Sequence, residues 1–143
     1  MSESTAVSRS VAIDLPDTDA PAAPLSWGVR RGPFLWVSGQ VSVDWTTGES
    51  IHGDIVDQTT ATLANVRRVL EAGGASLADV VKTTVFLTDI RLAPAMNAVY
   101  AEIFSDHPLP SRSTVQVGPL GRPEFLIEIE AQAYVDATMS EPN

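Results

Sequence analysis

The clearest structural signal in this 143-residue chain is the run Phe125-Leu-Ile-Glu-Ile-Glu-Ala-Gln-Ala-Tyr-Val135. Apolar residues alternate in it with residues that are mostly polar, and a period of two is typical of a strand with one buried face. The polar positions include Glu128, Glu130 and Gln132. We therefore expect a strand over 124–135, in a sheet that has one covered face and one face lined by polar side chains.

The rest of the chain predicts four more strands and two helices. The strands are expected over 27–30, 34–43, 80–88 and 111–117. One helix is expected to begin after Asp54, which suits the N-cap, and to end at Gly73-Gly74. A second is expected to begin after Asp89 and to end before His107-Pro-Leu-Pro110. The order ββαβαββ indicates an α+β fold, with a mixed sheet and both helices on one face.

The folded unit is expected to be a single domain over 25–135. Residues 1–24 contain three prolines, four acidic residues and no aromatic residue, so we expect a flexible arm that buries little. Val11 and Ile13 in this arm could add a little pairing at a sheet edge. Residues 136–143 are expected to form a C-terminal tail.

Composition argues against several classes of function. Nine Lys and Arg residues against 18 Asp and Glu residues give a net charge of −9, and no basic stripe is present, so we expect no nucleic-acid partner. No apolar run approaches the roughly 20 residues that a membrane span needs. The first residues lack the apolar core of a signal peptide. We expect a soluble cytoplasmic protein without a membrane partner.

Metal and thiol chemistry are also not expected. The chain has no cysteine, which excludes disulfides, a thiol nucleophile and thiolate metal sites. His52 and His107 are isolated in sequence and show no ligand spacing. We therefore expect no metal site.

The uncovered face of the sheet is the most informative surface. Alternation assigns Ser113, Val115 and Val117 to the helix-packed face, and Arg112, Thr114 and Gln116 to the opposite one. If strands 111–117 and 124–135 are neighbours in register, Arg112 and Glu130 share one surface. A solvated ion pair, worth about 0–1 kcal/mol, is one interpretation. An oligomer interface is the other, because Leu126, Phe34 and Trp36 would expose apolar area there, and a buried arginine suits a carboxylate.

Six short motifs, taken in order, resemble a known family. They are Ser38-Gly39-Gln40, Thr47-Gly48-Glu49, Val81-Lys-Thr-Thr-Val-Phe86, Asn97-Ala-Val-Tyr100, Pro110-Ser-Arg-Ser113 and Ile127-Glu-Ile-Glu-Ala131. Over roughly residues 21–135, their order and spacing resemble the RidA/YjgF family of enamine/imine deaminases, also called the L-PSP endoribonuclease-like family. The resemblance implies a chorismate-mutase-like fold and a homotrimer whose sheets face inward, with an active site in each cleft between subunits.

The resemblance also implies a reaction: hydrolysis of reactive 2-imino and enamine acids, such as 2-aminoacrylate, to 2-keto acids and ammonia, without a cofactor. By resemblance, Arg112 binds the substrate carboxylate and Glu130 orients the water. The implied substrate-binding residues are Ser38, Gly39, Asn97 and Thr114. Two positions depart from the family pattern: Leu25 stands where many members have a tyrosine, and Thr114 where many have a cysteine.

Alternative functions remain open at this point. Leu25 leaves room for a longer dienamine acid of the 2-aminomuconate type, and Trp27 or Trp36 in the cleft would favour bulkier substrates. An RNA-acting or translation-inhibiting protein is a further alternative, which the acidic charge counts against. A ligand binder or stress chaperone without catalytic activity is the last.

Overall fold

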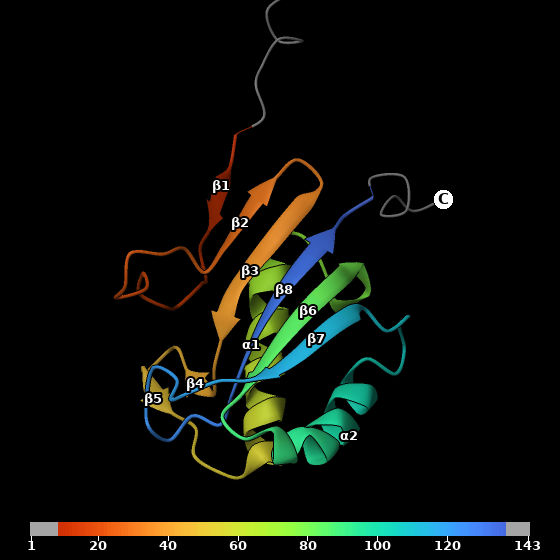
Figure 1. Ribbon diagram of the computed structural model, residues 1–143. Helices are drawn as coiled ribbons and strands as arrows, with labels where there is room; N and C mark the ends of the chain where they lie inside the picture. Colours follow the sequence, from red (N-terminus) through yellow and green to blue (C-terminus); the bar gives the residue numbers. More distant parts are fainter. Residues whose placement is uncertain (1–8, 137–143) are drawn as a thin grey trace, which may run out of the picture.

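Six strands form one mixed sheet in the order β1-β2-β3-β8-β6-β7 (Figure 1). This arrangement comes from a computed structural model, which describes residues 9–136. The strands are β1 Val11–Ile13, β2 Gly28–Arg31, β3 Phe34–Gln40, β6 Val80–Leu87, β7 Ser111–Gln116 and β8 Ile127–Tyr134. β6 and β7 are parallel, and the other neighbours are antiparallel.

Two α-helices cover one face of the sheet, as the sequence predicts (Figure 1). They are α1 Ile55–Ala72 and α2 Ala93–Ile103; short 3-10 helices, η2 Leu77–Asp79 and η3 Ile90–Leu92, precede β6 and α2. α1 begins where its sequence predicts: the Asp54 carboxylate accepts from the Asp57 amide at 3.0 Å, and Asp57 accepts from the Asp54 amide at 3.2 Å. Gly73 is its C-cap.

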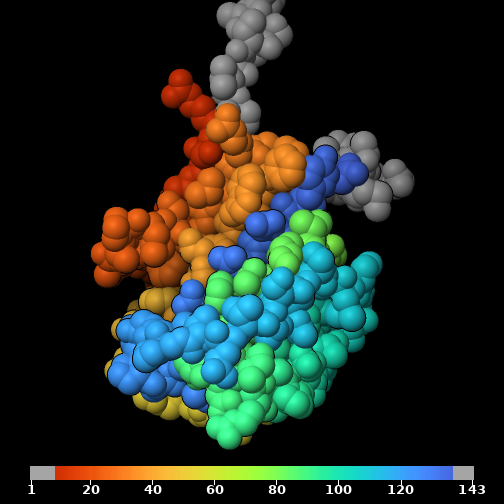
Figure 2. All heavy atoms as spheres, in the orientation of Figure 1, coloured from red at the N-terminus to blue at the C-terminus, as the bar shows by residue number. Residues whose placement is uncertain are grey.

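The core lies between the helices and the sheet. Side chains that are wholly buried from both layers meet there, including Leu35, Val66, Leu70, Val85, Met96 and Ile129. No helix formed by residues 9–136 covers the opposite face of the sheet. Figure 2 shows this face as a surface of strand side chains.

The two strands expected to be neighbours are separated. β8 lies between β3 and β6, whereas β7 is the edge strand beyond β6. The prediction that 111–117 and 124–135 pair is therefore wrong. The physical reason is that β7 follows β6 through a helical crossover and can lie parallel beside it, so β8 takes the place on the other side of β6.

The predicted faces of β7 are also reversed. Arg112 pairs with Thr83 and Thr114 pairs with Val85. Thr83 and Val85 are wholly buried on the helix side, and paired residues point to the same face of a sheet. Arg112 and Thr114 therefore lie on the helix side, while Ser113 faces the uncovered side, where it accepts a hydrogen bond from Lys82 at 2.8 Å. Leu126, also expected on the uncovered face, is half-buried against the core.

The N-terminal segment contributes more to the fold than its composition indicates. Val11 and Ile13 pair with β2, as expected. The expectation that this segment buries little is wrong, because Ile13 and Leu15 are each 5% exposed in the main core. Residues 1–8 and all but the first residue of the predicted tail 136–143 lie outside the described residues.

The strand expected over 34–43 ends early. β3 stops at Gln40, and the chain then forms a separate hairpin of β4 Val43–Asp44 and β5 Glu49–Ser50. Asn65 of α1 holds this departure in place, because its buried amide donates to the Val41 and Val43 carbonyls at 2.9 and 2.8 Å. The hairpin forms one wall of the site described below.

Candidate active site

A β-bulge lies at Ser38 and Gly39. β3 pairs with β8 through Val37 and Ala131 on one side of it and through Gln40 and Ile129 on the other. Two residues of β3 therefore occupy the place opposite Glu130. Bulges of this kind bend a strand and redirect side chains, and they are frequent beside active sites. The predicted pocket residues Ser38 and Gly39 thus lie at an irregular point of the sheet.

The Glu128 side chain occupies the space that a side chain at position 39 would need. A Cβ built on Gly39 would overlap the Glu128 carboxylate, with Cδ only 2.8 Å away. Any other residue at this position would displace that carboxyl group. Glycine is therefore needed for close approach, and not for an unusual backbone angle.

Glu128 and Gly39 line a hollow of about 440 Å³. The wall opposite comes from the segment before β2 and from the β4–β5 region. Its larger apolar lining residues are Leu25, Trp27, Val41, Trp45 and Phe125. The Trp27 and Trp45 rings lie 4.7 Å apart, and Trp45 donates to the buried Gln40 side chain at 3.1 Å. Apart from Glu128, the charged residue of this hollow is Arg122.

Glu128 has the electrostatics of an acid–base group. Burial raises the pKa of its half-buried carboxyl group, and the negative charge of Glu130 raises it further. A carboxyl group whose pKa is raised holds its proton to a higher pH than an ordinary glutamate, which suits a group that donates a proton. Raised values of this kind are frequent at functional sites.

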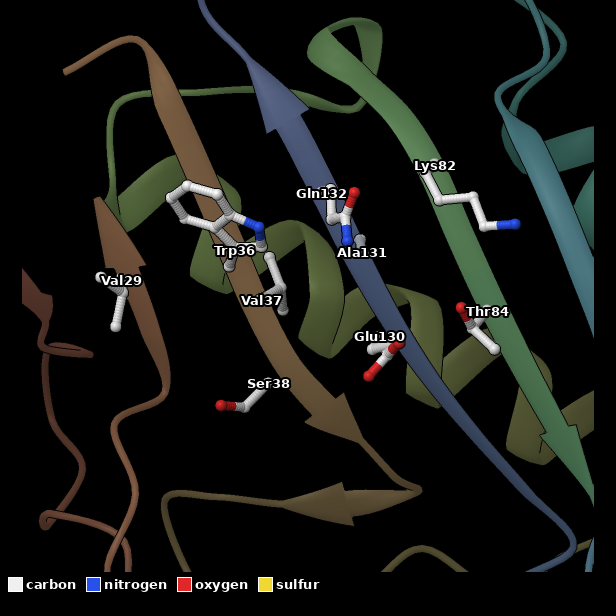
Figure 3. A pocket seen from close by; sticks show the side chains of 9 residues that line it. All are labelled: Val29, Trp36, Val37, Ser38, Lys82, Thr84, Glu130, Ala131 and Gln132. Atoms are coloured by element: carbon white, nitrogen blue, oxygen red, sulfur yellow. The ribbon is translucent and has the colours of Figure 1, made fainter. Parts of the chain in front are cut away.

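The sequence analysis names Glu130 as a candidate and does not name Glu128, which the structure places against Gly39. Figure 3 shows Glu130 of β8 between Ser38 of β3 and Thr84 of β6, on the uncovered face of the sheet. It is exposed there and lines a separate hollow of about 160 Å³, to which Ser38 contributes but Gly39 does not. Because both glutamates share one side of the same strand, alternation could not separate them.

A second cluster lies at the β7 edge of the sheet. Arg112 and Asn97 line a hollow of about 400 Å³ together with Tyr100 of α2. The Arg112 guanidinium lies over the Tyr100 ring, 4.8 Å from its centroid. The Tyr100 hydroxyl is fixed in turn by a 2.6 Å hydrogen bond with the buried Thr83. Thr114, half-buried on the same strand, does not line this hollow.

Arg112 is therefore positioned but unpaired. Over residues 9–136, the structure has one ion pair, between Arg91 and Asp89. One nitrogen of Arg112 makes a long 3.9 Å contact with the Met96 sulfur, and the aromatic ring beneath stabilises the charge without using the other donors. Such a guanidinium suits a carboxylate that it can bind through two parallel hydrogen bonds.

The two clusters lie apart within one chain. Glu128 is on β8 and Arg112 is on β7, with β6 between them, so two steps between strands separate the two positions by about 10 Å. Arg112 is on the helix side of the sheet, whereas Glu130 is on the uncovered side. The prediction that Arg112 and Glu130 share one surface of a single sheet is wrong. What the chain does bring together is Ser38 with Glu130, Gly39 with Glu128, and Asn97 with Arg112.

The part of the chain that the structure describes holds no cluster of three or more histidine and acidic side chains placed to bind a metal ion. None of its helices is both long enough and apolar enough to span a membrane.

Comparison with known proteins places this architecture in a family. The model of the family described as Endoribonuclease L-PSP matches residues 17–135. The chain belongs to this family, RidA/YjgF. The RutC family protein PH0854 of Pyrococcus horikoshii is 46% identical over 114 residues, which are 80% of this chain and 89% of that protein. The resemblance seen in the sequence motifs is confirmed.

Two further members relate the family to small amino- and imino-acid chemistry. A protein of Dermatophagoides farinae named 2-iminobutanoate/2-iminopropanoate deaminase is 35% identical over 124 residues, covering 87% of this chain and 95% of that protein. The crystal structure of E. coli TdcF with bound serine matches with a TM-score of 0.81 and 35% identity, over 88% of this chain and 99% of that one. The RidA/YjgF fold predicted from the sequence is thereby confirmed.

Proposed function

We propose that this RidA/YjgF protein is a deaminase that hydrolyses 2-imino acids and their enamine tautomers to 2-keto acids and ammonia. The observation that carries the proposal is the division of chemistry between two hollows. One hollow presents the unpaired guanidinium of Arg112, and the other presents the half-buried carboxyl group of Glu128. The deaminase name of the D. farinae relative supports the same reaction.

The two hollows belong to one site if copies of the chain meet head to tail. Complementary surfaces at opposite edges of a subunit generate a closed ring, and the family resemblance sets that ring as a homotrimer. We propose that the uncovered sheet faces point inward in this ring. The β7–α2 edge of one copy then closes over the Glu128 hollow of the next.

An aromatic cluster supports burial of the uncovered face. Phe34 stacks on Trp36 with ring centroids 5.7 Å apart, and its other neighbour Tyr134 meets it edge-on at 5.2 Å. These three side chains are 48%, 41% and 43% exposed in the single chain. Aromatic residues that gather on an uncovered face are typical of a subunit interface.

The geometry supports the following steps. Arg112 of one copy binds the substrate carboxylate through two parallel hydrogen bonds, and Asn97 beside it limits the orientation. Protonated Glu128 of the next copy gives its proton to the imine nitrogen, which makes C2 electrophilic. The resulting carboxylate takes a proton from the water that attacks C2. It returns this proton to nitrogen, and as the C–N bond breaks it takes the proton of the new C2 hydroxyl. The products are ammonia and the 2-keto acid, and Glu128 is again protonated.

Glu130 has a supporting role in this proposal. Its negative charge on the same face of β8 keeps the pKa of Glu128 raised and so favours the protonated starting form. Ser38 and Gly39 shape the wall, because Ser38 donates to the Ser26 carbonyl at 2.7 Å and Gly39 leaves room for Glu128. The steps use no metal and no organic cofactor.

The test is an assay on imines generated in place. An amino-acid oxidase supplies 2-iminopropanoate or 2-iminobutanoate, and semicarbazide competes to trap the imine. We expect the wild-type protein to lower semicarbazone formation from the imine and to accelerate ammonia release, and Arg112→Gln to lose this effect. Absence of acceleration over a series of imines would instead favour a ligand binder without catalysis.

The RNA-acting alternative is not favoured. The net charge of −9 and the small number of basic residues offer little to a phosphate backbone. RNA cleavage by a highly purified preparation, retained in both Arg112→Gln and Glu128→Gln, is the result that would support it.

A further inference from the structure

Arg122 lines the same hollow as Glu128 and has no role in the steps above. Its half-buried guanidinium lies 5.5 Å from the centroid of the Phe125 ring, and one of its nitrogens donates to the Ser50 hydroxyl at 2.8 Å. A ring and a hydroxyl therefore hold this cation at the wall of the cavity. Two such contacts fix its direction and leave most of its donors unused.

No carboxylate of the described residues pairs with Arg122. The nearby Glu124 carboxylate accepts a short 2.5 Å hydrogen bond from Ser50, and this bond, with a smaller contribution from the charge of Arg122, lowers the pKa of Glu124. Glu124 nevertheless makes no ion pair with Arg122, since over residues 9–136 only Arg91 and Asp89 do so. Arg122 therefore lines the hollow without a carboxylate partner among residues 9–136.

The hollow that Glu128 and Arg122 share is lined mainly by apolar side chains. Leu25, Trp27 and Trp45 line it, and Leu25 brings no hydroxyl where the family resemblance leads one to expect a tyrosine. A second hollow of about 250 Å³ shares Trp27, Trp45 and Arg122 and continues under residues 19–22. Arg122 therefore lines both hollows, on the same cavity as Glu128 and beside apolar side chains.

We propose that Arg122 binds an anionic group at the far end of the substrate side chain. The preferred substrates are then 2-imino or enamine dicarboxylic acids whose middle section is apolar and extended. This inference rests on the proposed function: Arg112 of one copy holds the first carboxylate, Glu128 of the next serves C2, and Arg122 takes the second carboxylate. A half-buried guanidinium selects strongly, because a substrate with an apolar end leaves it unpaired.

The experiment compares two imines of equal chain length. An amino-acid oxidase generates them from 2-aminoadipate, which has a terminal carboxylate, and from norleucine, which has a methyl group there. We expect wild-type kcat/KM to favour the dicarboxylate, and Arg122→Gln to lower the ratio of the two values by about tenfold or more. Arg122→Lys keeps the charge but loses the planar donor set, so an intermediate ratio is expected.

Arg91→Gln is the matched control, because this arginine side chain is 87% exposed in η3 and belongs to neither hollow. It removes one positive charge and should leave the ratio unchanged. If the wild type hydrolyses norleucine imine and the ratio of kcat/KM values is unchanged in Arg122→Gln, this inference is wrong while the proposed deaminase function stands. Loss of the preference in Arg91→Gln as well as in Arg122→Gln also overturns it, because overall charge would then be the cause.

Calorimetry tests the role of Arg122 in ligand binding without requiring catalytic activity. It measures the wild-type Kd for 2-oxoadipate and for 2-oxohexanoate, which differ only in the terminal group. We expect tighter binding of 2-oxoadipate, lost by about tenfold or more in Arg122→Gln. Equal Kd values in the wild type overturn the inference. If no imine is hydrolysed but this preference is found, the proposed reaction fails while the role of Arg122 in ligand binding stands.

Discussion

Two regions of the sheet, the edge strand β7 and the interior strand β8, carry different halves of the chemistry. At the β7 edge, Arg112 has a fixed charge, a ring beneath it and no acidic partner. On β8, which β6 separates from β7, Glu128 has a charge that depends on pH, set by burial and by a like-charged neighbour. A fixed cation can bind a substrate, and a titratable carboxyl group can move protons. Because the two groups lie on different sides of the sheet, the proposed reaction requires Arg112 of one copy and Glu128 of another.

The largest effect is expected from Glu128→Gln. The amide cannot supply or take up the proton, so kcat should fall by about 10²-fold or more. Glu130→Gln is the control on the same face of the same strand and should cost less than about tenfold. Ammonia release under saturating imine measures both. If kcat falls more in Glu130→Gln than in Glu128→Gln, Glu130 is the acid–base group and the role proposed for Glu128 beside Gly39 is wrong.

Arg112→Gln should come next and should act on binding. Losing a charge-assisted pair with the substrate carboxylate lowers kcat/KM by about 10–10²-fold, mostly through KM. Arg91→Gln removes a charge at an exposed position and should change kcat/KM less than about twofold. Steady-state kinetics on one imine separates the two variants. Equal kcat/KM in Arg112→Gln and the wild type would remove the β7 edge from the site.

Gly39→Ala tests whether the position of the Glu128 carboxyl group matters for activity. Its Cβ needs space that the Glu128 carboxyl group occupies, so this group must move, and we expect kcat/KM to fall by about tenfold. Gly118→Ala is the control, because a Cβ there meets no atom within 4 Å. Full activity in Gly39→Ala would show that the position of Glu128 against β3 is not needed.

The smallest effect is one on stability. Burial raises the pKa of Glu128, so the folded protein binds this proton more tightly than the unfolded chain does. The stabilisation is complete below the unfolded pKa and is lost as pH rises through the folded pKa. Glu128→Gln, which cannot ionise, should therefore raise Tm at pH 8 by about a few degrees at most, with the difference vanishing near pH 4. A lower Tm at pH 8 would give Glu128 a structural role.

The sequence predicts well what is local. Asp54 and Gly73 bound α1 through contacts within a few residues, and the alternation of β8 needs no partner to be recognised. The α+β fold and the covered and uncovered faces follow from these patterns together. The short strand β1 is likewise indicated by its own residues, Val11 and Ile13.

Contacts between distant segments were not predictable in this way. Which face Arg112 occupies depends on its pairing with Thr83, and the residues of β7 differ too little in polarity to show it. Glu128 and Glu130 are two residues apart on β8 and face the same side of the sheet. Their surroundings differ because β3 bulges at Ser38 and Gly39. Strand order and bulges are set by packing across the chain, which a single sequence does not display.

The most direct measurement uses mixed oligomers of Arg112→Ala and Glu128→Gln chains, co-expressed with different tags and purified through both. If each site takes Arg112 from one copy and Glu128 from the next, a mixed trimer contains one intact site. At imine concentrations below KM it should show about one third of the wild-type activity, far more than either variant alone. If the mixed trimers are as inactive as their parents, both residues of a site come from one chain, and the account of a site shared between copies is wrong.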